Sequence, residues 1–159
     1  MISPPVLAAI AWAVVLGFGG ALMTPIEAWY SGLRKPAWQP PDWLFGPAWT
    51  IILALAAWAG VIAWHAARSA DDQRTILIVF LVNGLCHFAW SPLFFRLRRP
   101  DWALVEVVFL WTSLVAMIVG LWPISQMAAL MILPYLAWVS FAAALNRAIV
   151  RLNPSFGGR

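Results

Sequence analysis

Long apolar runs alternate with short polar segments along the whole chain. A helix needs about 20 apolar residues to cross the hydrocarbon core of a bilayer. Five runs meet this requirement, and we predict spans at about 4–25, 44–67, 75–95, 102–122 and 124–147. The pattern therefore predicts an all-α integral membrane protein, in which residues 1–159 form a single bundle of five transmembrane helices.

The fifth run contains Pro134, which lacks an amide hydrogen and should kink the helix near that point. Only Trp122 and Pro123 separate this run from the fourth. A connection as short as this predicts that the fourth and fifth helices are antiparallel neighbours.

The basic residues are divided unevenly between the two sides of the predicted bundle. Eight of the ten fall in the first loop, the third loop and the tail: Arg34, Lys35, Arg96, Arg98, Arg99, Arg147, Arg151 and Arg159. The other side has only Arg68 and Arg74. Because short loops rich in Lys and Arg stay in the cytoplasm, we expect a non-cytoplasmic N-terminus and a cytoplasmic C-terminus. The first loop, 26–43, then lies on the cytoplasmic side.

Composition supports a membrane protein and excludes several other classes. The chain is 64% hydrophobic and 10% charged, whereas about 25% of the residues in a soluble domain are charged. The net charge of +4 is explained by membrane orientation and gives no indication of nucleic-acid binding. The single cysteine, Cys86, rules out a disulfide within the chain and a multi-cysteine metal site.

Three of the predicted spans carry polar or aromatic residues at helical spacing. These stripes are Trp49, Leu53, Gly60 and Trp64 in the second span, Asn83, His87, Trp90 and Phe94 in the third, and Tyr135, Trp138, Ala142 and Asn146 in the fifth. Polar groups avoid lipid, so the three stripes should face one another. Packing within the bundle explains any one stripe adequately. Together they predict an aromatic cavity for a flat, mostly apolar ligand.

The segment between the first two spans is rich in proline and tryptophan. Residues 29–50 read WYSGLRKPAWQPPDWLFGPAWT, with four of each. Proline prevents a regular helix, and tryptophan is poorly suited to full exposure to water. We therefore predict a stiff loop that covers the cavity at one membrane face as a lid.

This segment closely resembles the first-loop signature of the TspO/MBR family, the translocator protein and tryptophan-rich sensory protein family, also called the peripheral-type benzodiazepine receptor family. The signature reads roughly W-Y-x-x-L-x-K-P-x-W-x-P-P-x-W-x-F-x-P-x-W-T. WSPLFF at 90–95, PYLAW at 134–138 and the following Leu145 and Asn146 also match the family. The resemblance covers essentially the whole chain and identifies it as similar to bacterial-type members.

The resemblance implies a five-helix bundle, commonly a homodimer, that binds porphyrins, isoquinoline-carboxamide drugs and sterols or other lipids, with no obligatory cofactor. It places Trp38 and Pro40 in the lid and Tyr30 at the helix end below it. It also matches Trp49 and Trp138 to two cavity tryptophans linked to light-dependent porphyrin breakdown. Ala142 corresponds to a small residue that tunes ligand affinity.

The chain departs from the family at two places. His87 stands where the family usually has Asn, and Asn83 lies one turn earlier. A neutral imidazole can ligate haem iron, whereas a histidine that only bonds across helices, for example to Tyr135 or Asn146, is the alternative. A proposed sterol motif is missing after Asn146, a pattern that is weak in any case, and its absence lowers the expectation of sterol binding.

The remaining polar residues suggest no separate chemistry. Trp43, Trp64, Trp102 and Trp122 fit an interfacial aromatic belt, and we expect Glu106 to reach the interface or an arginine of 96–99. Two functions therefore stay open from the sequence. The first is a receptor or carrier in tetrapyrrole homeostasis. The second is a porphyrin-degrading enzyme that uses Trp49 and Trp138.

Overall fold

The computed structural model describes residues 3–25 and 28–154, and their regular structure is helical with no strand. Among these residues, five stretches are long and apolar enough to cross a membrane, as predicted. They are built from α1 (Pro4–Leu22), α3 (Phe45–Ala66), α4 (Ala70–Ser91) with the π-helical turn η2 (Pro92–Arg96), α5 (Pro100–Leu121), and α6 (Gln126–Leu130) followed by α7 (Leu133–Leu152). The first loop contains α2 (Ala28–Ser31) and the 3₁₀ turn η1 (Asp42–Leu44).

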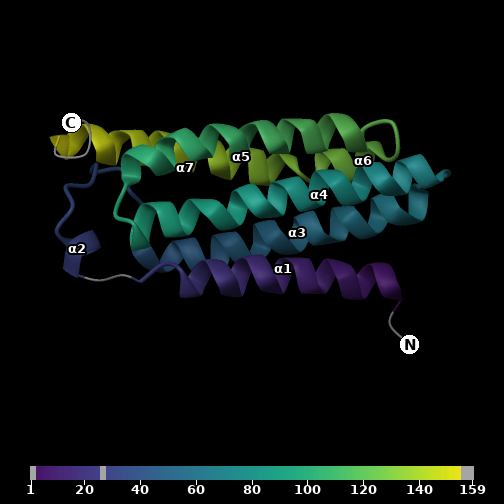
Figure 1. Ribbon diagram of the computed structural model, residues 1–159, viewed down its shortest axis with the longest axis horizontal. Coiled ribbons are helices and arrows are strands. Elements are labelled where there is room, and N and C mark those ends of the chain that lie inside the picture. Colours follow the sequence, from purple (N-terminus) through teal and green to yellow (C-terminus); the bar gives the residue numbers. More distant parts are fainter. Residues whose placement is uncertain (1–2, 26–27, 155–159) are drawn as a thin grey trace.

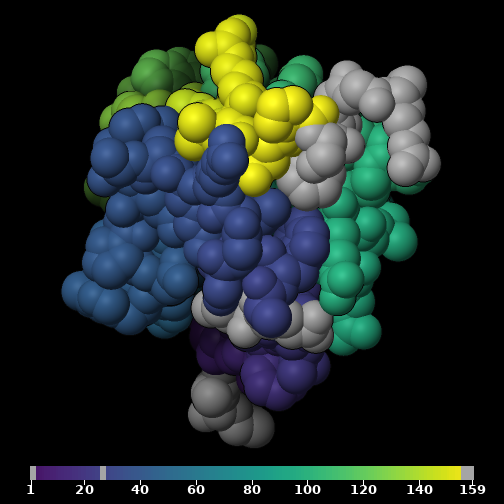
Figure 2. All heavy atoms as spheres, turned by 90° about the vertical axis from the view of Figure 1, so that its left-hand side faces the viewer, coloured from purple at the N-terminus to yellow at the C-terminus, as the bar shows by residue number. Residues whose placement is uncertain are grey.

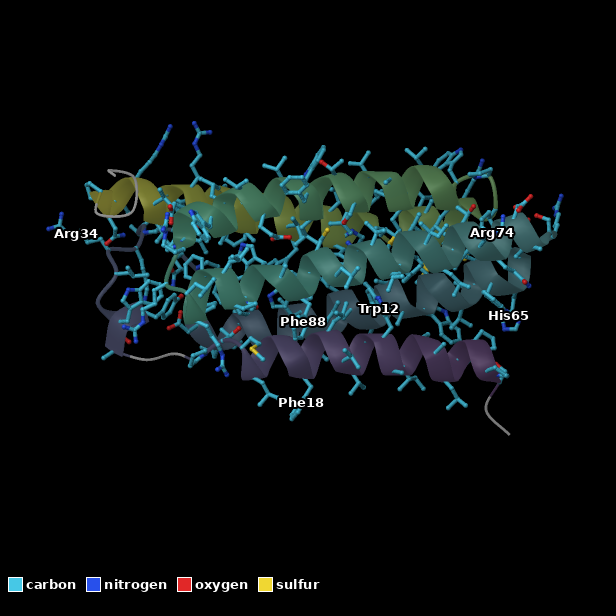
Figure 3. All side chains as sticks on the ribbon, in the orientation of Figure 1. Trp12, Phe18, Arg34, His65, Arg74 and Phe88 are labelled. Carbon is cyan, nitrogen blue, oxygen red and sulfur yellow. The ribbon has the colours of Figure 1, made fainter. Side chains whose placement is uncertain are left out.

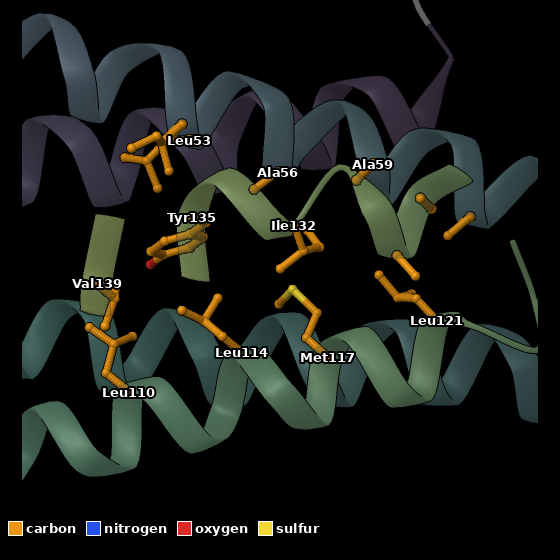
Figure 4. Close-up of a cluster of buried hydrophobic side chains, with 14 of the residues drawn as sticks. Leu53, Ala56, Ala59, Leu110, Leu114, Met117, Leu121, Ile132, Tyr135 and Val139 are labelled. Atoms are coloured by element: carbon orange, nitrogen blue, oxygen red, sulfur yellow. The ribbon is translucent and has the colours of Figure 1, made fainter. Parts of the chain in front are cut away.

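The spans pack in a closed ring in the order α1, α3, α6–α7, α5 and α4. α1 begins at one end of the bundle and α7 finishes at the other, as five crossings require (Figure 1). α5 packs along α6 and α7, which confirms that the last two spans are neighbours. Within the ring, Leu53 of α3 and Leu114 of α5 face each other across Tyr135 of α7 (Figure 4).

The third span begins earlier than the sequence pattern predicts, because α4 starts at Ala70 and not at residue 75. A capping box starts the helix. The Asp72 amide donates to Ser69 Oγ at 3.1 Å, and the Ser69 amide donates to Asp72 Oδ2 at 3.1 Å. The two bonds satisfy amides that the first turn leaves unpaired, and the acidic residue also favours the positive end of the helix dipole. The predicted separator at 67–74 is therefore mostly helix.

The fifth span is broken near Pro134, as predicted. α6 ends at Leu130 and α7 starts again at Leu133, which puts Pro134 in the first turn of a new helix. Backbone N–H groups in the first turn of a helix have no acceptor within that helix. A proline, which lacks this hydrogen, therefore costs little stability there. α7 then runs to Leu152, beyond the predicted end at residue 147.

Most charged residues, with Glu106 of α5 as an exception, lie at the two ends of the bundle. Arg34 lies at the end that holds the first loop, and Arg74 and His65 lie at the opposite end (Figure 3). Phe18 points away from the bundle, where lipid would surround it (Figure 3). This arrangement fits an integral membrane protein, while the orientation of the termini stays a prediction. Arg159, one of the basic residues of the tail, lies outside the described residues.

The expectation for Glu106 is wrong. Glu106 shares the buried face of α5 with Leu110 and Ser113, and neither of its carboxylate oxygens has a hydrogen-bond partner among the described residues. Glu106 lies nearly two turns inside α5, which begins at Pro100, and is turned inward, so its side chain does not pair with an arginine of the third loop. The sequence indicated the depth of this acid but not the direction in which it points.

Candidate functional site

A cavity of about 440 Å³ lies inside the ring at the end covered by the first loop. Its volume falls within the range of about 300–1,000 Å³ that is common for small-molecule sites. Residues from α1, α3, α4, η2, α5 and α7 line it, together with Tyr30 and Asp42 of the loop. Of the residues selected from the sequence, the lining includes Tyr30, Trp49, His87, Trp90, Phe94, Trp138, Ala142 and Asn146.

Four of the candidate ligand-binding residues lie elsewhere, as do Gly60 and Trp64 of the second-span stripe. Asn83 is fully buried and donates from Nδ2 to Ser113 Oγ at 3.0 Å, so it ties α4 to α5. Tyr135 lies behind the cavity wall, in the bundle core. Trp38 and Pro40 belong to the loop and are not among the lining residues.

Trp49 is the centre of the aromatic wall. Its ring centroid lies 4.9 Å from that of His87, 5.8 Å from that of Tyr135 and 6.2 Å from that of Trp138, each in an edge-on arrangement. Edge-to-face contacts of this kind hold aromatic rings in fixed positions. Trp49 and Trp138, which stand far apart in the sequence, are thus direct neighbours in the cavity.

His87 is tied to the wall by one ring nitrogen. The Tyr135 hydroxyl lies 2.6 Å from His87 Nδ1, which is a short hydrogen bond. The hydrogen bond across helices to Tyr135 is thus present, while the haem-ligand hypothesis for His87 stays a prediction. Nε2 remains the nitrogen through which the ring could reach a ligand, and His87 lines the cavity. Metal-binding groups of three or more His, Cys, Asp or Glu side chains do not occur among the described residues.

Two cavity tryptophans carry unpaired polar groups. The indole Nε1 atoms of Trp90 and Trp138 are buried and have no hydrogen-bond partner in the described part of the chain. Buried donors are rarely left unpaired, and each such group calls for an explanation. Both residues line the cavity, but their Nε1 atoms are themselves buried and are not open to it.

Asn146 also lines the cavity but has a structural partner. With its amide oriented to satisfy both atoms, it donates to the Pro100 carbonyl at 3.0 Å and accepts from the Leu104 amide at 3.1 Å. These are backbone groups in the first turn of α5. Asn146 therefore links α7 to α5 at the rim of the cavity.

The first loop is fixed over the cavity by polar and aromatic contacts. Tyr30 donates to Asp42 Oδ1 at 3.2 Å, and Gln39 Nε2 lies 3.2 Å from the Tyr30 hydroxyl and 3.1 Å from Asp42 Oδ1. The ring of Tyr30 packs on Phe95 at 5.4 Å between centroids. Burial, and next the charge of Asp42, raise the pKa of Tyr30 to about 12, so its hydroxyl stays protonated at neutral pH.

The first loop is also hydrogen-bonded, at Arg34, to Asn153 at the end of α7. Asn153 Oδ1 accepts from the Arg34 amide at 3.0 Å, and its Nδ2 donates to the Arg34 carbonyl at 2.9 Å. Figure 2 shows the loop, in blue, across this end of the molecule beside the end of α7, in yellow. Trp38 is 51% exposed and packs edge-on against Phe141 of α7 at 5.8 Å. These contacts agree with a stiff lid.

Sequence reasoning missed several positions at this site. Gly20 of α1 and Thr24, which lies just after the end of that helix, line the cavity, and neither was among the residues selected from the sequence. Gly19 does pack, because an added Cβ would lie 2.7 Å from Phe88, whereas nothing lies within 4 Å of such a Cβ at Gly20. The spacing of glycines in a helix does not reveal which one faces a cavity. Asn153 gave no sequence signal because its partner is a backbone group 119 positions away.

Comparison of the sequence with those of known proteins identifies a family. The model of the TspO/MBR family matches residues 8–152. The chain is 40% identical to the tryptophan-rich protein TspO of Archaeoglobus fulgidus, over 92% of this chain and 95% of that protein. It is 35% identical to the tryptophan-rich protein TspO of Chlorobaculum tepidum, over 91% and 93%. It is also 33% identical to the translocator protein of Sus scrofa, over 99% and 97%.

Proposed function

The chain belongs to the TspO/MBR family, and from that premise we propose that it binds porphyrins and similar flat, apolar ligands in the cavity beneath the lid. Family membership and the five apolar helices indicate an integral membrane protein with a receptor or regulatory role. The finer proposal is that this role is played in tetrapyrrole homeostasis, by sensing the ligand or carrying it.

One observation carries the proposal: aromatic side chains, among them Trp49, Trp90 and Trp138, line the cavity. Aromatic faces stack on flat π-systems. A porphyrin offers a large flat π-system with polar atoms at its periphery. Isoquinoline carboxamides are flat and offer a carbonyl acceptor, and they belong to the same proposal, as do sterols or lipids as weaker ligands.

The test is a titration of the purified protein with protoporphyrin, haem and a sterol, followed by tryptophan quenching. We expect saturable binding of protoporphyrin, weakened in a Trp138→Phe variant that loses part of the aromatic wall. Trp58→Phe is the matched control, because Trp58 lies on α3 but is 55% exposed on the outside of the bundle. Binding that is absent, or equal in both variants, would reject the cavity as the porphyrin site.

Light-dependent porphyrin degradation is a second candidate function. The observation that favours it is the 6.2 Å separation of the Trp49 and Trp138 rings, with His87 and Tyr135 against Trp49. Neighbouring indoles inside one cavity can pass an electron between them when a bound pigment is excited. Bleaching of porphyrin absorbance in light, lost in Trp138→Phe at saturating ligand, would support the enzyme. Stable porphyrin absorbance with the wild-type protein in light would contradict the enzyme function, and the receptor function would remain as the proposal.

A homodimer is part of the same proposal, since the family resemblance implies one. Crosslinking in membranes, compared with the mass of the purified protein in detergent, would test it. A monomer in both settings would contradict this expectation without affecting the cavity.

A further inference from the structure

The charges around the cavity restrict where an acidic ligand can place its carboxylates. Among the residues that the structure describes, those lining the cavity include one charged side chain, Asp42, and neither Lys nor Arg. A carboxylate buried among such residues would be unpaired, at a large desolvation cost. Next to the lid it would also face the negative charge of Asp42. A ligand carboxylate therefore has to lie at the edge of the cavity, away from Asp42.

One guanidinium lies at such an edge. Arg96, the last residue of η2, donates from Nη2 to the Leu22 carbonyl at the end of α1 at 3.3 Å. Close by in the chain, the Thr24 hydroxyl donates to the Gly20 carbonyl at 2.7 Å and its oxygen lies 3.4 Å from Ser91 Oγ. Both residues line the cavity. The Ser91 hydroxyl is therefore the one with a hydrogen to donate to a ligand. The side chain of Arg96 thus joins η2 to the end of α1. In the chain, Thr24 follows Leu22 by two residues and Ser91 precedes Arg96 by five.

The neighbouring basic residues are held elsewhere. Lys35 Nζ lies 3.8 Å above the ring of Tyr30. The Arg99 side chain bonds to Asp101, with Nε 2.8 Å from Oδ1. Arg96 is exposed, and no carboxylate among the described residues pairs with it. A guanidinium has five N–H donors in a planar fork, so one bond to a carbonyl leaves others available.

We propose that Arg96, with the hydroxyl of Ser91, forms an anion-binding mouth between α1 and α4. A carboxylate of the ligand binds there, while the apolar body of the ligand lies against the aromatic wall. The inference rests on the proposed porphyrin binding. It adds the orientation of the bound ligand and a preference between ligands that differ in charge. Ligands with free carboxylates are preferred to their esters, and they enter with the acidic edge outward.

The test combines two ligands with three proteins. Protoporphyrin and its dimethyl ester have the same ring but differ in charge, and each is titrated into the wild type, Arg96→Gln and Arg147→Gln. Arg147 is the control, an exposed arginine at the same end of the bundle that does not line the cavity. We expect Arg96→Gln to weaken binding of the free acid at least about tenfold, the lower range for a charged hydrogen bond. Binding of the ester should change little, and Arg147→Gln should bind both ligands like the wild type.

Each outcome separates the inference from the proposed function. If the wild type binds acid and ester equally, or if Arg96→Gln weakens both equally, the mouth is wrong while porphyrin binding stands. If neither ligand binds the wild type, the proposed function fails first. Unchanged ester binding also shows that Arg96→Gln folds despite losing its bond to α1. Arg96→Lys keeps the charge and should recover part of the preference for the acid, which a purely structural role would not predict.

Discussion

The contact between Asn153 and Arg34 should control how often the lid opens. Asn153→Ala removes two hydrogen bonds to the Arg34 backbone, one at 3.0 Å and one at 2.9 Å. Each is worth about 0.5–1.5 kcal/mol, and both lie at an exposed position where water replaces part of the loss. We therefore expect the closed lid to lose about 1–2 kcal/mol. The fraction of molecules in which the lid is open should therefore rise about 5–30-fold.

Limited trypsin digestion measures this population directly. The lid offers a single susceptible bond, between Arg34 and Lys35, because Lys35 is followed by proline. When opening is fast compared with cleavage, the cleavage rate follows the open population. Cutting after Arg34 should thus accelerate about 5–30-fold in Asn153→Ala. Thr112→Ala, which removes an exposed hydroxyl of α5 bonded within its own helix, should not change it.

Cleavage after Arg151 serves as an internal control. Asn153 Nδ2 also bonds to the Ile149 carbonyl of α7 at 2.8 Å, so the substitution could loosen the end of that helix. If cleavage after Arg34 and after Arg151 rises in parallel, helix fraying explains the result and the contact is not a lid latch. An unchanged rate after Arg34 would refute the reasoning altogether.

Further predictions follow from the cavity and the ring of helices. Gly46→Leu should weaken porphyrin binding with little loss of stability, because nothing lies within 4 Å of an added Cβ at this cavity-lining position; Gly46→Ala should have a small effect in the same titration, and equal effects would contradict the size argument. Trp38→Ala should weaken binding by about 1 kcal/mol, since half of the ring is exposed and its partner is a helix and not the ligand; an unchanged dissociation constant would remove the lid from the site. Added haem should give a histidine-ligated Soret band that His87→Asn abolishes while metal-free porphyrin still binds; parallel loss of both ligands would leave His87 as a hydrogen-bonding residue. Reporters fused to the two termini should be cytoplasmic only at the C-terminus, and finding both on one side would contradict the five-span topology.

The number of spans and the general chemistry of the site were readable from the sequence, because they depend on local patterns. Runs of about 20 apolar residues need no tertiary information to be identified as membrane helices. The break near Pro134 was predictable for the same reason, since the missing amide hydrogen is a property of the residue itself. Helical spacing also placed His87, Trp90 and Phe94 on one face, and all three line the cavity.

Only the tertiary structure decided how far each of those faces reaches into the cavity. Asn83 shares a face with His87 in the sequence, yet it bonds to Ser113 of α5, because the ring order puts α5 beside that part of α4. A face of a helix touches several neighbours along its length, and spacing alone does not say which neighbour lies at which depth. The same limit applies to Asn153, whose partner is the backbone of the first loop, 119 positions earlier in the sequence. Periodicity fixes the direction of a side chain about its own helix axis, whereas its partner depends on how the five helices are arranged around the core.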